Sequence, residues 1–249
     1  MKKLVIFLVC IMSFPLLVGF SPKNEITVAT WNILHGNGVI ESQKHQIRHM
    51  RADVIALQEV DEKTDRVMGK SCLDILSNGV YPFTGFGKEQ DYKSGEFGLG
   101  FLSKNYLFNT KISFPEYEGS IERDGIMKTT IRKDGKIISV YNFHFSYAYY
   151  WVRDRQMQQA AEIFAKDPNK YKILMGDFNV EDIKEFDVFK DCNVLSNSKN
   201  PVETYMGDDW STKCIDNIIY SENLVLESYE LEETKYSDHK PLIAKFKMA

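Results

Sequence analysis

Short stretches with the character of β-strands constrain the fold of this chain more than any other feature. The sequence holds sixteen Phe and thirteen Tyr, which favour strands. Helix-like stretches are fewer, and they do not alternate regularly with the strand-like ones. The expected strands are 26–31, 54–57, 98–102, 128–132, 137–143, 172–175, 215–220 and 242–246, and the expected helices are 42–51, 70–77, 153–165 and 183–189.

This pattern favours an α/β fold in which two β-sheets pack face to face with helices outside. A parallel sheet with crossover helices is the alternative. In the stretch 153–165, Met157, Ala160, Ala161 and Phe164 recur at spacings of three and four, which predicts one apolar helix face. The Asp134-Gly135 pair between two strand-like stretches predicts a tight hairpin.

The chain is long enough, at 249 residues, for one large domain with a sizeable core. No repeat, low-complexity tract or long Pro/Gly/Ser-rich linker divides it. We therefore expect a single domain over 22–249, which we expect to be a monomer.

The first twenty residues differ from the rest of the chain. Lys2 and Lys3 precede an apolar run that continues to Phe20 and is interrupted only by Ser13 and Pro15. A short basic segment followed by such a run predicts a signal peptide over 1–20. An uncleaved membrane anchor is the alternative, although the run is short for a full span. The expected location is the periplasm, the extracellular space, or a membrane reached through residues 4–20.

The overall charge is acidic, with a formal net charge of −4. Removing the leader would remove two lysines and no acidic residue, so the exported domain would be more negative still. Such a domain has no general electrostatic attraction to nucleic acid or to an anionic membrane. Beyond the leader, an odd number of cysteines (Cys72, Cys192 and Cys214) is not typical of a disulfide framework, although one pair stays open.

Polar residues with catalytic or ligating chemistry follow five apolar stretches and precede a sixth, 242–246. A single polar residue after a strand is usually a solvated turn residue, but the recurrence at six ends indicates a shared site. Asp177 and Asn179 are two residues apart, so in extended chain they face the same side. Gly176 before them permits a close backbone approach. The six ends carry Asn32, Gln58 with Glu59, His144, Asp177 with Asn179, Asp216, and Asp238 with His239.

If these ends converge, four carboxylates share one cleft: Glu59, Asp177, Asp216 and Asp238. Close carboxylates raise one another's pKa values unless a cation neutralises them. Carboxylate and amide oxygens suit a hard divalent ion, first Mg²⁺ and then Mn²⁺ or Ca²⁺. Two histidines supply groups that titrate near neutral pH. The combination predicts hydrolysis of a phosphoester.

Six segments in this order resemble the endonuclease/exonuclease/phosphatase superfamily, which includes deoxyribonucleases, apurinic endonucleases, sphingomyelinases and inositol-polyphosphate phosphatases. The similarity extends from about residue 26 to the end, and "GDFN" together with "SDHxP" is its most specific part. It implies a four-layer α/β sandwich of two mostly antiparallel sheets flanked by helices. The segments are "TWNILHG" (30–36), "ALQEVD" (56–61), "NFHFS" (142–146), "MGDFNV" (175–180), "IDNIIYS" (215–221) and "YSDHKPL" (236–242).

The resemblance also implies roles. Glu59 would be the principal metal ligand, with Asn32 and Asp238 in or near the metal shell. Asp177 would orient or deprotonate the attacking water, and Asn179 would hold phosphate oxygens. His239 would act against the scissile phosphate, and Asp216 would fix its tautomer. His144 would be the second phosphate-side imidazole, with Glu96 as its carboxylate partner and Arg123 as a phosphate-side arginine.

The sequence does not decide between small phosphodiesters, phospholipid head groups and nucleic acid as substrate. It also does not decide between a phosphodiester and a phosphomonoester. Acidic charge does not favour nucleic acid, and transient membrane contact is an alternative. The aromatic residues after His144 are expected either to line the substrate cleft or to staple the following helix onto the core. A non-catalytic binding domain on the same fold is the alternative function. The candidate wall residues are Tyr147, Tyr149, Tyr150, Trp151 and Trp210.

Overall fold

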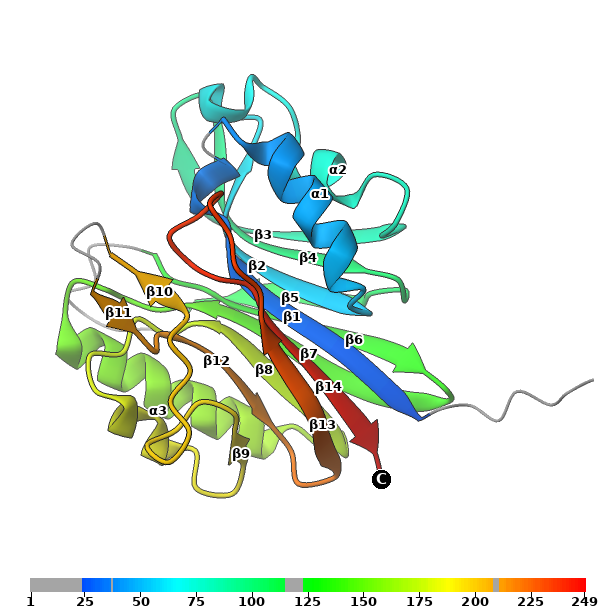
Figure 1. The fold of residues 1–249 in the computed structure, drawn as a ribbon, viewed down its shortest axis with the longest axis vertical. Helices are drawn as coiled ribbons and strands as arrows, with labels where there is room; N and C mark the ends of the chain where they lie inside the picture. Colours follow the sequence, from blue (N-terminus) through cyan, green and yellow to red (C-terminus); the bar gives the residue numbers. More distant parts are fainter. Residues whose placement is uncertain (1–23, 37, 115–122, 208–210) are drawn as a thin grey trace, which may run out of the picture.

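A computed structural model describes residues 24–36, 38–114, 123–207 and 211–249 as two stacked six-stranded sheets (Figure 1). The first sheet has the order β13-β14-β1-β2-β4-β3. Its strands are β1 (Glu25–Asn32), β2 (Val54–Glu62), β3 (Phe83–Tyr92), β4 (Gly95–Ser103), β13 (Leu224–Leu231) and β14 (Leu242–Met248).

The second sheet has the order β5-β6-β7-β8-β12-β9. Its strands are β5 (Phe108–Ser113), β6 (Ile126–Lys133), β7 (Lys136–His144), β8 (Tyr171–Asp177), β9 (Asn193–Val194) and β12 (Asp216–Tyr220). A small separate ribbon is formed by β10 (Tyr205–Met206) and β11 (Thr212–Lys213). The helical elements are η1 (Leu34–Gly36), α1 (Ile40–Met50), η2 (Asp65–Val67), α2 (Cys72–Ser77), α3 (Tyr150–Lys166) and η3 (Ile183–Val188).

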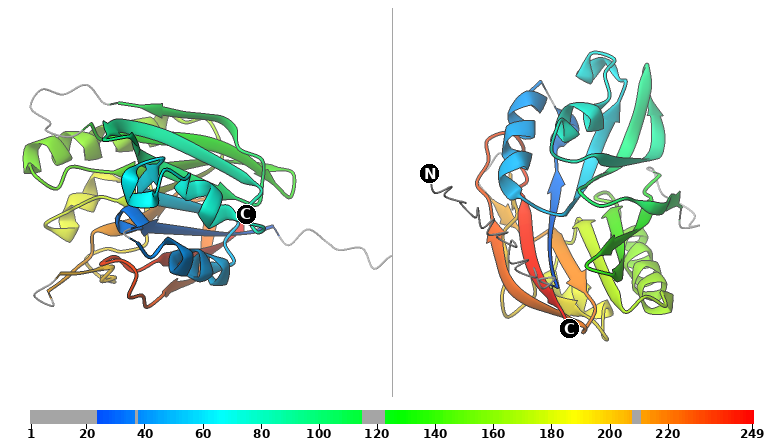
Figure 2. Two further views of the ribbon diagram at one scale, coloured as in Figure 1. Left: turned by 90° about the horizontal axis from the view of Figure 1, so that it is seen from above. Right: turned by 90° about the vertical axis from the view of Figure 1, so that its right-hand side faces the viewer.

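Helices cover the outer face of each sheet, which completes four layers (Figure 2). Side chains alternate along the strands, so Val28 enters the core between the sheets while Ala29 and Trp31 pack outward with α1 and α2. On the other sheet, Tyr141 and Phe143 pack outward with α3. The predicted apolar helix face is confirmed, because Met157, Ala160 and Phe164 are buried there and Ala161 is partly buried.

Each of the eight strand-like stretches forms all or most of a strand, and the sandwich prediction is confirmed. The parallel alternative is wrong for the sheets as a whole, although β1–β2 and β7–β8 are parallel pairs. The connections of these two pairs contain α1 and α3, as parallel strands require a crossover. The sequence did not identify β3, β5 and β13, which lie at sheet edges and carry many polar residues.

The predicted hairpin joins β6 and β7. Lys133 pairs with Lys136, and Asp134 and Gly135 between them have φ values of 50° and 77°. Two successive positive φ values define the two-residue turn that matches strand twist. Cys72, Cys192 and Cys214 are all free, so no two of them form a disulfide.

Two sequence predictions lie outside the described residues: the leader over 1–20 and the wall residue Trp210. In the described part of the chain, no helix is long and apolar enough to cross a membrane.

Candidate functional site

Strand register places three of the predicted residues side by side. In the second sheet, His144 of β7 pairs with Asp177 of the parallel strand β8. Asp177 also pairs with Asp216 of the antiparallel strand β12. Asp177 and Asp216 are each only 1% exposed, so two carboxylates are buried next to each other.

Glu59 reaches the same place from the first sheet because β2 bulges there. Three steps along β2, from Leu57 to Val60, oppose two steps along β4, from Gly100 to Gly98. Glu59 takes a φ of 56° at this irregularity, and such an extra residue redirects a side chain out of the ladder. The bulge turns Glu59 into the cleft that lies between the sheet ends.

Asn32, at the end of β1, connects the two sheets at the site. Its Nδ2 atom donates to Glu59 Oε1 at 3.0 Å and to Asp177 Oδ2 at 3.1 Å. Its Oδ1 atom accepts a hydrogen bond from the backbone N–H of Leu34 at 3.1 Å. In this arrangement Asn32 orients two carboxylates, and its own oxygen is engaged by the backbone.

A second bridge between the sheets lies directly behind the site. Gln58 Nε2 donates to Asn142 Oδ1 at 2.7 Å, and Asn142 Nδ2 donates to the carbonyls of Leu57 and Gly100, each at 2.9 Å. Both side chains are fully buried. Asn142 was not predicted as a site residue, because an Asn inside a strand pattern gives no sign of its partner in another sheet.

Gly176 allows β7 and β8 to lie against each other at the site. Its φ is +154°, and a Cβ atom there would lie 2.1 Å from the carbonyl oxygen of Phe143. The close backbone approach predicted for this glycine is confirmed. Asn179 follows with a φ of 50°, and its side chain donates to the carbonyl of Phe145 at 2.9 Å.

His239 is held between two carboxylates. Its Nδ1 atom lies 2.8 Å from Asp216 Oδ2 in a hydrogen bond, and its Nε2 atom lies 3.6 Å from Asp177 Oδ2. Trp31 Nε1 donates to the His239 carbonyl at 2.9 Å, which fixes the backbone. Burial alone would lower the pKa of His239, but the two carboxylates outweigh burial and raise this pKa to about 10.

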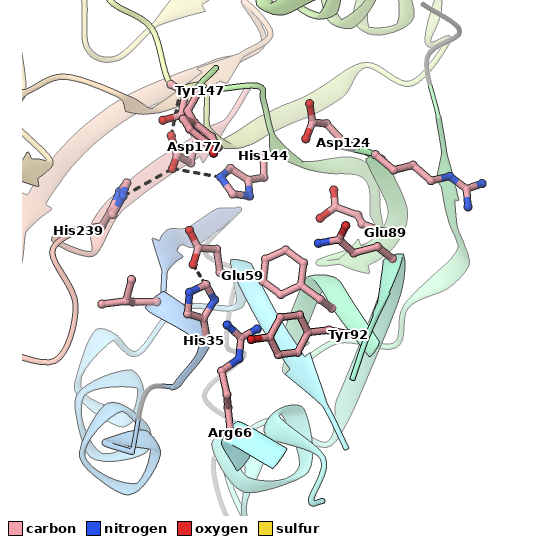
Figure 3. A pocket seen from close by; sticks show the side chains of 15 residues that line it. His35, Glu59, Arg66, Glu89, Tyr92, Asp124, His144, Tyr147, Asp177 and His239 are labelled. Atoms are coloured by element: carbon pink, nitrogen blue, oxygen red, sulfur yellow. Dashed lines mark hydrogen bonds and ion pairs between the residues drawn. The ribbon is translucent and has the colours of Figure 1, made fainter. Parts of the chain in front are cut away.

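His144 lies on the other side of Asp177, with Nε2 3.7 Å from Asp177 Oδ2 (Figure 3). Burial lowers its pKa, but the negative charges of Asp177, Glu59, Glu89 and Asp124 raise this pKa to about 9. The prediction that Glu96 is the carboxylate partner of His144 is wrong. Its carboxylate is paired with Lys88 at 3.0 Å, because its strand position directs it away from the cleft.

Glu59 and Asp177 have pKa values shifted in opposite directions. Burial raises the pKa of Glu59, but His35, His144 and Asn32 outweigh burial and lower this pKa to about 2. For Asp177, burial and the neighbouring Asp216 prevail over the two histidines and raise the pKa to about 6. Glu59 is therefore an anion at neutral pH, whereas Asp177 exchanges its proton near neutrality.

Glu59 fits a divalent cation better than the other acids of the site. Its Oε2 atom is buried and receives no hydrogen bond, although His35 Nδ1 lies 2.9 Å away as an ion-pair contact. Asp177, Asp216 and His239 bring one ligand atom each within 4.8 Å of one another, but Asp216 and His239 are already hydrogen-bonded together. A hard ion prefers carboxylate oxygens that accept few other hydrogen bonds. Glu59 Oε2 and Asp216 Oδ1 are both buried without a hydrogen bond, and of these two residues Glu59 lines the cleft.

The remaining predicted ligand, Asp238, is half-buried next to His239 and accepts a hydrogen bond from Ser237 Oγ at 3.3 Å. It contributes to the raised pKa of His239, but it does not line the cleft. His35 does line the cleft, although it was not predicted as a site residue. Its position inside the segment "TWNILHG" was the available signal.

The cleft has a volume of about 350 Å³. Glu59, His144, Asp177, Asn179 and His239 line its centre. At the rim lie Arg123, whose guanidinium packs 3.9 Å from the centre of the Phe114 ring, and Tyr147, which is 64% exposed. Glu89 and Asp124 line the side next to His144 (Figure 3).

Among the described residues of the predicted wall, Tyr149, Tyr150 and Trp151 lie outside this cleft. Tyr149 and Trp151 stack with ring centroids 4.6 Å apart, and Tyr150 and Trp151 are both more than half exposed. Tyr150 and Trp151 do not staple α3 onto the core, because the start of this helix is held by the buried Val152 and by buried polar side chains. Gln156 Oε1 accepts the N–H of Ser146 at 2.9 Å, and the buried Arg153 is paired with Glu185 at 2.8 Å.

Proteins similar to this chain are known in sequence and in structure. A sequence model of the Endonuclease/Exonuclease/phosphatase family matches residues 29–239. No curated protein sequence matches the chain. A solved endonuclease/exonuclease/phosphatase from Beutenbergia cavernae DSM 12333 is 16% identical with a TM-score of 0.73, and the match covers 90% of this chain and 72% of that one.

Two further solved structures are similar over most of both chains. The endonuclease/exonuclease/phosphatase from Bacteroides vulgatus is 16% identical with a TM-score of 0.71, covering 90% of this chain and 99% of that one. TDP2 from D. rerio, complexed with a single strand DNA product, is 15% identical with a TM-score of 0.70. The match covers 89% of this chain and 98% of that one. At these identities the structures establish a shared fold.

Proposed function

The chain belongs to the endonuclease/exonuclease/phosphatase family of metal-dependent phosphoester hydrolases, and on that premise we propose that it is an exported Mg²⁺-dependent phosphodiesterase acting on a small substrate. One observation carries the proposal. Glu59, whose buried Oε2 atom is contacted by His35, lies in one cleft with Asp177 and the cationic His144 and His239. This combination provides a cation site beside groups that donate and accept protons.

Each side chain has a role that follows from its geometry. Glu59 would hold the divalent ion, which when bound offsets negative charge on the phosphate. Asp177 orients the attacking water and accepts its proton, for which a pKa of about 6 is suited. His239 and His144 are protonated at neutral pH and donate hydrogen bonds to phosphate oxygens. Asp216 keeps the proton on His239 Nδ1, so that Nε2 points to the substrate.

The size of the cleft and the charge of the chain support a small diester. A volume of about 350 Å³ is at the lower end for a small-molecule site. A net charge of −4 gives no general attraction to polyanions. The single-strand DNA held by the TDP2 structure belongs to that protein, and nucleic acid enters here as a competing substrate in the test.

The test compares four substrates in parallel: bis-p-nitrophenyl phosphate, p-nitrophenyl phosphate, sphingomyelin and plasmid DNA. Each is offered with Mg²⁺ and with EDTA, to wild type and to Glu59→Gln, which keeps the side-chain shape and removes the charge. Glu41→Gln on the exposed face of α1 is the matched control. We expect Mg²⁺-dependent turnover of the diester that is retained in Glu41→Gln and lost in Glu59→Gln.

Other outcomes identify other functions. Preferential cleavage of p-nitrophenyl phosphate, sphingomyelin or DNA would replace the small-diester assignment with a monoesterase, a phospholipase or a nuclease. If none of the four substrates is turned over and Mg²⁺ does not bind, the chain is a non-catalytic binding domain on this fold.

We also propose that residues 1–20 export the chain and that 22–249 is the mature domain. The basic start and apolar run support this assignment. Mass spectrometry of the purified protein from its native cells should find an N-terminus between about residues 20 and 24. Recovery of the intact chain from membranes would instead establish an anchor.

A further inference from the structure

A rigid arginine lies on the side of the cleft beyond Glu59. Arg66 Nε and Nη2 each approach an oxygen of Asp61 at 2.7 Å, and Thr64 Oγ1 donates to the same carboxylate at 2.7 Å. Asp61 is completely buried. A bidentate pair of this kind fixes the plane of the guanidinium, and Nη1 is its remaining edge. Asp61 belongs to the segment "ALQEVD", and the catalytic roles leave it unexplained.

Aromatic rings surround this guanidinium. Arg66 Cζ lies 3.8 Å from the centre of the Tyr92 ring and 5.8 Å from the centre of the Phe97 ring. The Phe97 and His35 ring centroids are 5.7 Å apart at an angle of 53°. All four side chains line the cleft, and Figure 3 shows Arg66, Tyr92 and His35 grouped on the Glu59 side.

Neither Tyr92 nor Phe97 is needed by the hydrophobic core. Both are half-exposed, and neither is among the buried core residues or the partly buried residues that pack on them. The β3–β4 hairpin is already tied to η2 by Lys93, whose Nζ atom lies 2.9 Å from Asp65 Oδ2. Two aromatic rings exposed to a cleft are available for a ligand.

The charges in this part of the cleft disfavour a second anionic group. Asp61 compensates the charge of Arg66, so the pair is electrically neutral as a unit. Glu59 and Glu89 line the neighbouring wall and are acidic. A second phosphate or carboxylate on this side would therefore meet Glu59, Glu89 and an arginine whose charge Asp61 already offsets. A flat uncharged ring can contact the aromatic side chains and accept hydrogen bonds from the guanidinium edge.

We propose that Arg66, Tyr92 and Phe97 form a subsite for an uncharged flat ring carried by one substituent of the phosphodiester. The inference rests on the proposed function, because the phosphate at Glu59 and His239 places the substituent. It adds a substrate class: one phosphate joined to an aryl or nucleobase-like ring, in preference to a polyphosphorylated or purely aliphatic alcohol.

The test measures binding of three non-hydrolysable phosphonates to the full-length protein in Mg²⁺ by calorimetry. Methylphosphonate has the anionic head group alone, phenylphosphonate adds a ring, and 4-carboxyphenylphosphonate adds a ring with a second charge. We expect phenylphosphonate to bind about three- to tenfold more tightly than methylphosphonate, the value of one or two aromatic contacts. The carboxylated ring should lose this advantage.

Variants of Tyr92 and Phe97 test whether these two rings contact the phenyl group. Tyr92→Leu and Phe97→Leu should bring the phenyl-to-methyl affinity ratio close to one and leave methylphosphonate binding unchanged. Tyr229→Leu, an exposed tyrosine on β13, is the matched control and should keep the wild-type ratio. Urea unfolding of each variant shows that the fold persists.

Three results would overturn the inference. A wild-type ratio near one excludes a ring subsite. A ratio that survives in Tyr92→Leu and Phe97→Leu but falls in Tyr147→Leu moves the subsite to the opposite rim. Binding of neither phosphonate removes the proposed phosphate site and this inference with it, whereas equal binding of both leaves the proposed phosphate site standing.

Discussion

At the scale of single residues, the site works because neighbours shift the pKa values of like groups apart. Glu59 stays ionised with a pKa of about 2, and Asp177 has a pKa of about 6, although both are buried carboxylates. Both carboxylates face imidazoles and the Asn32 amide. Burial together with the adjacent Asp216 outweighs these groups at Asp177, whereas at Glu59 the imidazoles and the amide outweigh burial. Two chemically identical groups can thus act as metal ligand and as proton acceptor.

The raised pKa of His239 predicts a pH dependence of stability in the metal-free protein. The folded state keeps this proton up to a pH of about 10, whereas an unfolded histidine releases it near 6.5. The contribution of the His239 proton to the free energy of unfolding is therefore complete below pH 6.5 and is lost as the pH rises towards 10. Urea unfolding in EDTA should show a free energy of unfolding that falls over this range.

His239→Gln should remove much of that slope, while His45→Gln on the exposed face of α1 should leave it as in wild type. An unchanged slope in His239→Gln would mean that Asp216 and Asp177 do not stabilise the imidazolium.

Gly176 gives a second prediction at this scale. Gly176→Ala places a Cβ atom 2.1 Å from the Phe143 carbonyl oxygen and should cost about 3 kcal/mol of the free energy of unfolding. Gly135→Ala in the β6–β7 turn also has a positive φ, but nothing lies within 4 Å of its added Cβ. It should cost only about 1 kcal/mol. Equal losses in urea unfolding would show that φ strain, and not the close strand approach, requires glycine.

At the scale of elements, the bulge in β2 decides where Glu59, the proposed metal ligand, points. A regular strand would place Gln58 and Glu59 on opposite faces of the sheet and would not turn Glu59 out of the ladder. The irregular register against β4 and the positive φ at Glu59 instead direct this side chain to the strand ends of the second sheet.

The bulge predicts that glycine is more stable than alanine at position 59, the reverse of the order at a regular strand position. At a φ of 56°, Glu59→Gly should be about 1 kcal/mol more stable than Glu59→Ala, because an L-residue is strained in this conformation. At the regular and buried position 56 of the same strand, Ala56→Gly should lose about 1 kcal/mol. Chemical denaturation of the three variants measures both differences. The same sign at both positions would argue against the bulge.

At the scale of the whole molecule, the site exists because two sheets end at the same edge of the sandwich. Asn32 crosses between them at the cleft, and Gln58 and Asn142 cross behind it. Buried polar pairs of this kind fix relative position, because sliding one sheet would leave donors and acceptors without partners. The cleft geometry thus depends on the alignment of the two sheets.

Asn142→Leu tests this alignment. It leaves Gln58 Nε2 and the carbonyls of Leu57 and Gly100 without their buried partner, which should cost about 3 kcal/mol or more. It should also weaken Mg²⁺ binding, because β2 carries Glu59. Ser139→Ala on the same strand loses the hydrogen bonds of this hydroxyl with Asn169 and Asp167 and should cost about 1–2 kcal/mol with unchanged Mg²⁺ affinity. Calorimetric Mg²⁺ titration of both variants decides whether the bridge positions the site.

Much of the fold could be predicted from the sequence because apolar runs and turn residues act locally. The eight strand-like stretches, the Asp134-Gly135 hairpin and the apolar face of α3 each follow from side chains within a few positions. The edge strands β3, β5 and β13 did not follow, since a strand paired on one side need not be apolar. Gly176 was predictable because a glycine before two polar residues marks a tight approach.

The order of the motifs predicts which chemical groups make up the site, because it names Glu59, His144, Asp177 and His239. How these groups are paired depends on the three-dimensional fold. It placed Lys88, and not His144, against Glu96, and it brought His35 to Glu59 and Arg66 to Tyr92. The physical reason is that register, a single bulge and the alignment of two sheets set distances between residues far apart in the chain, and none of these leaves a local pattern.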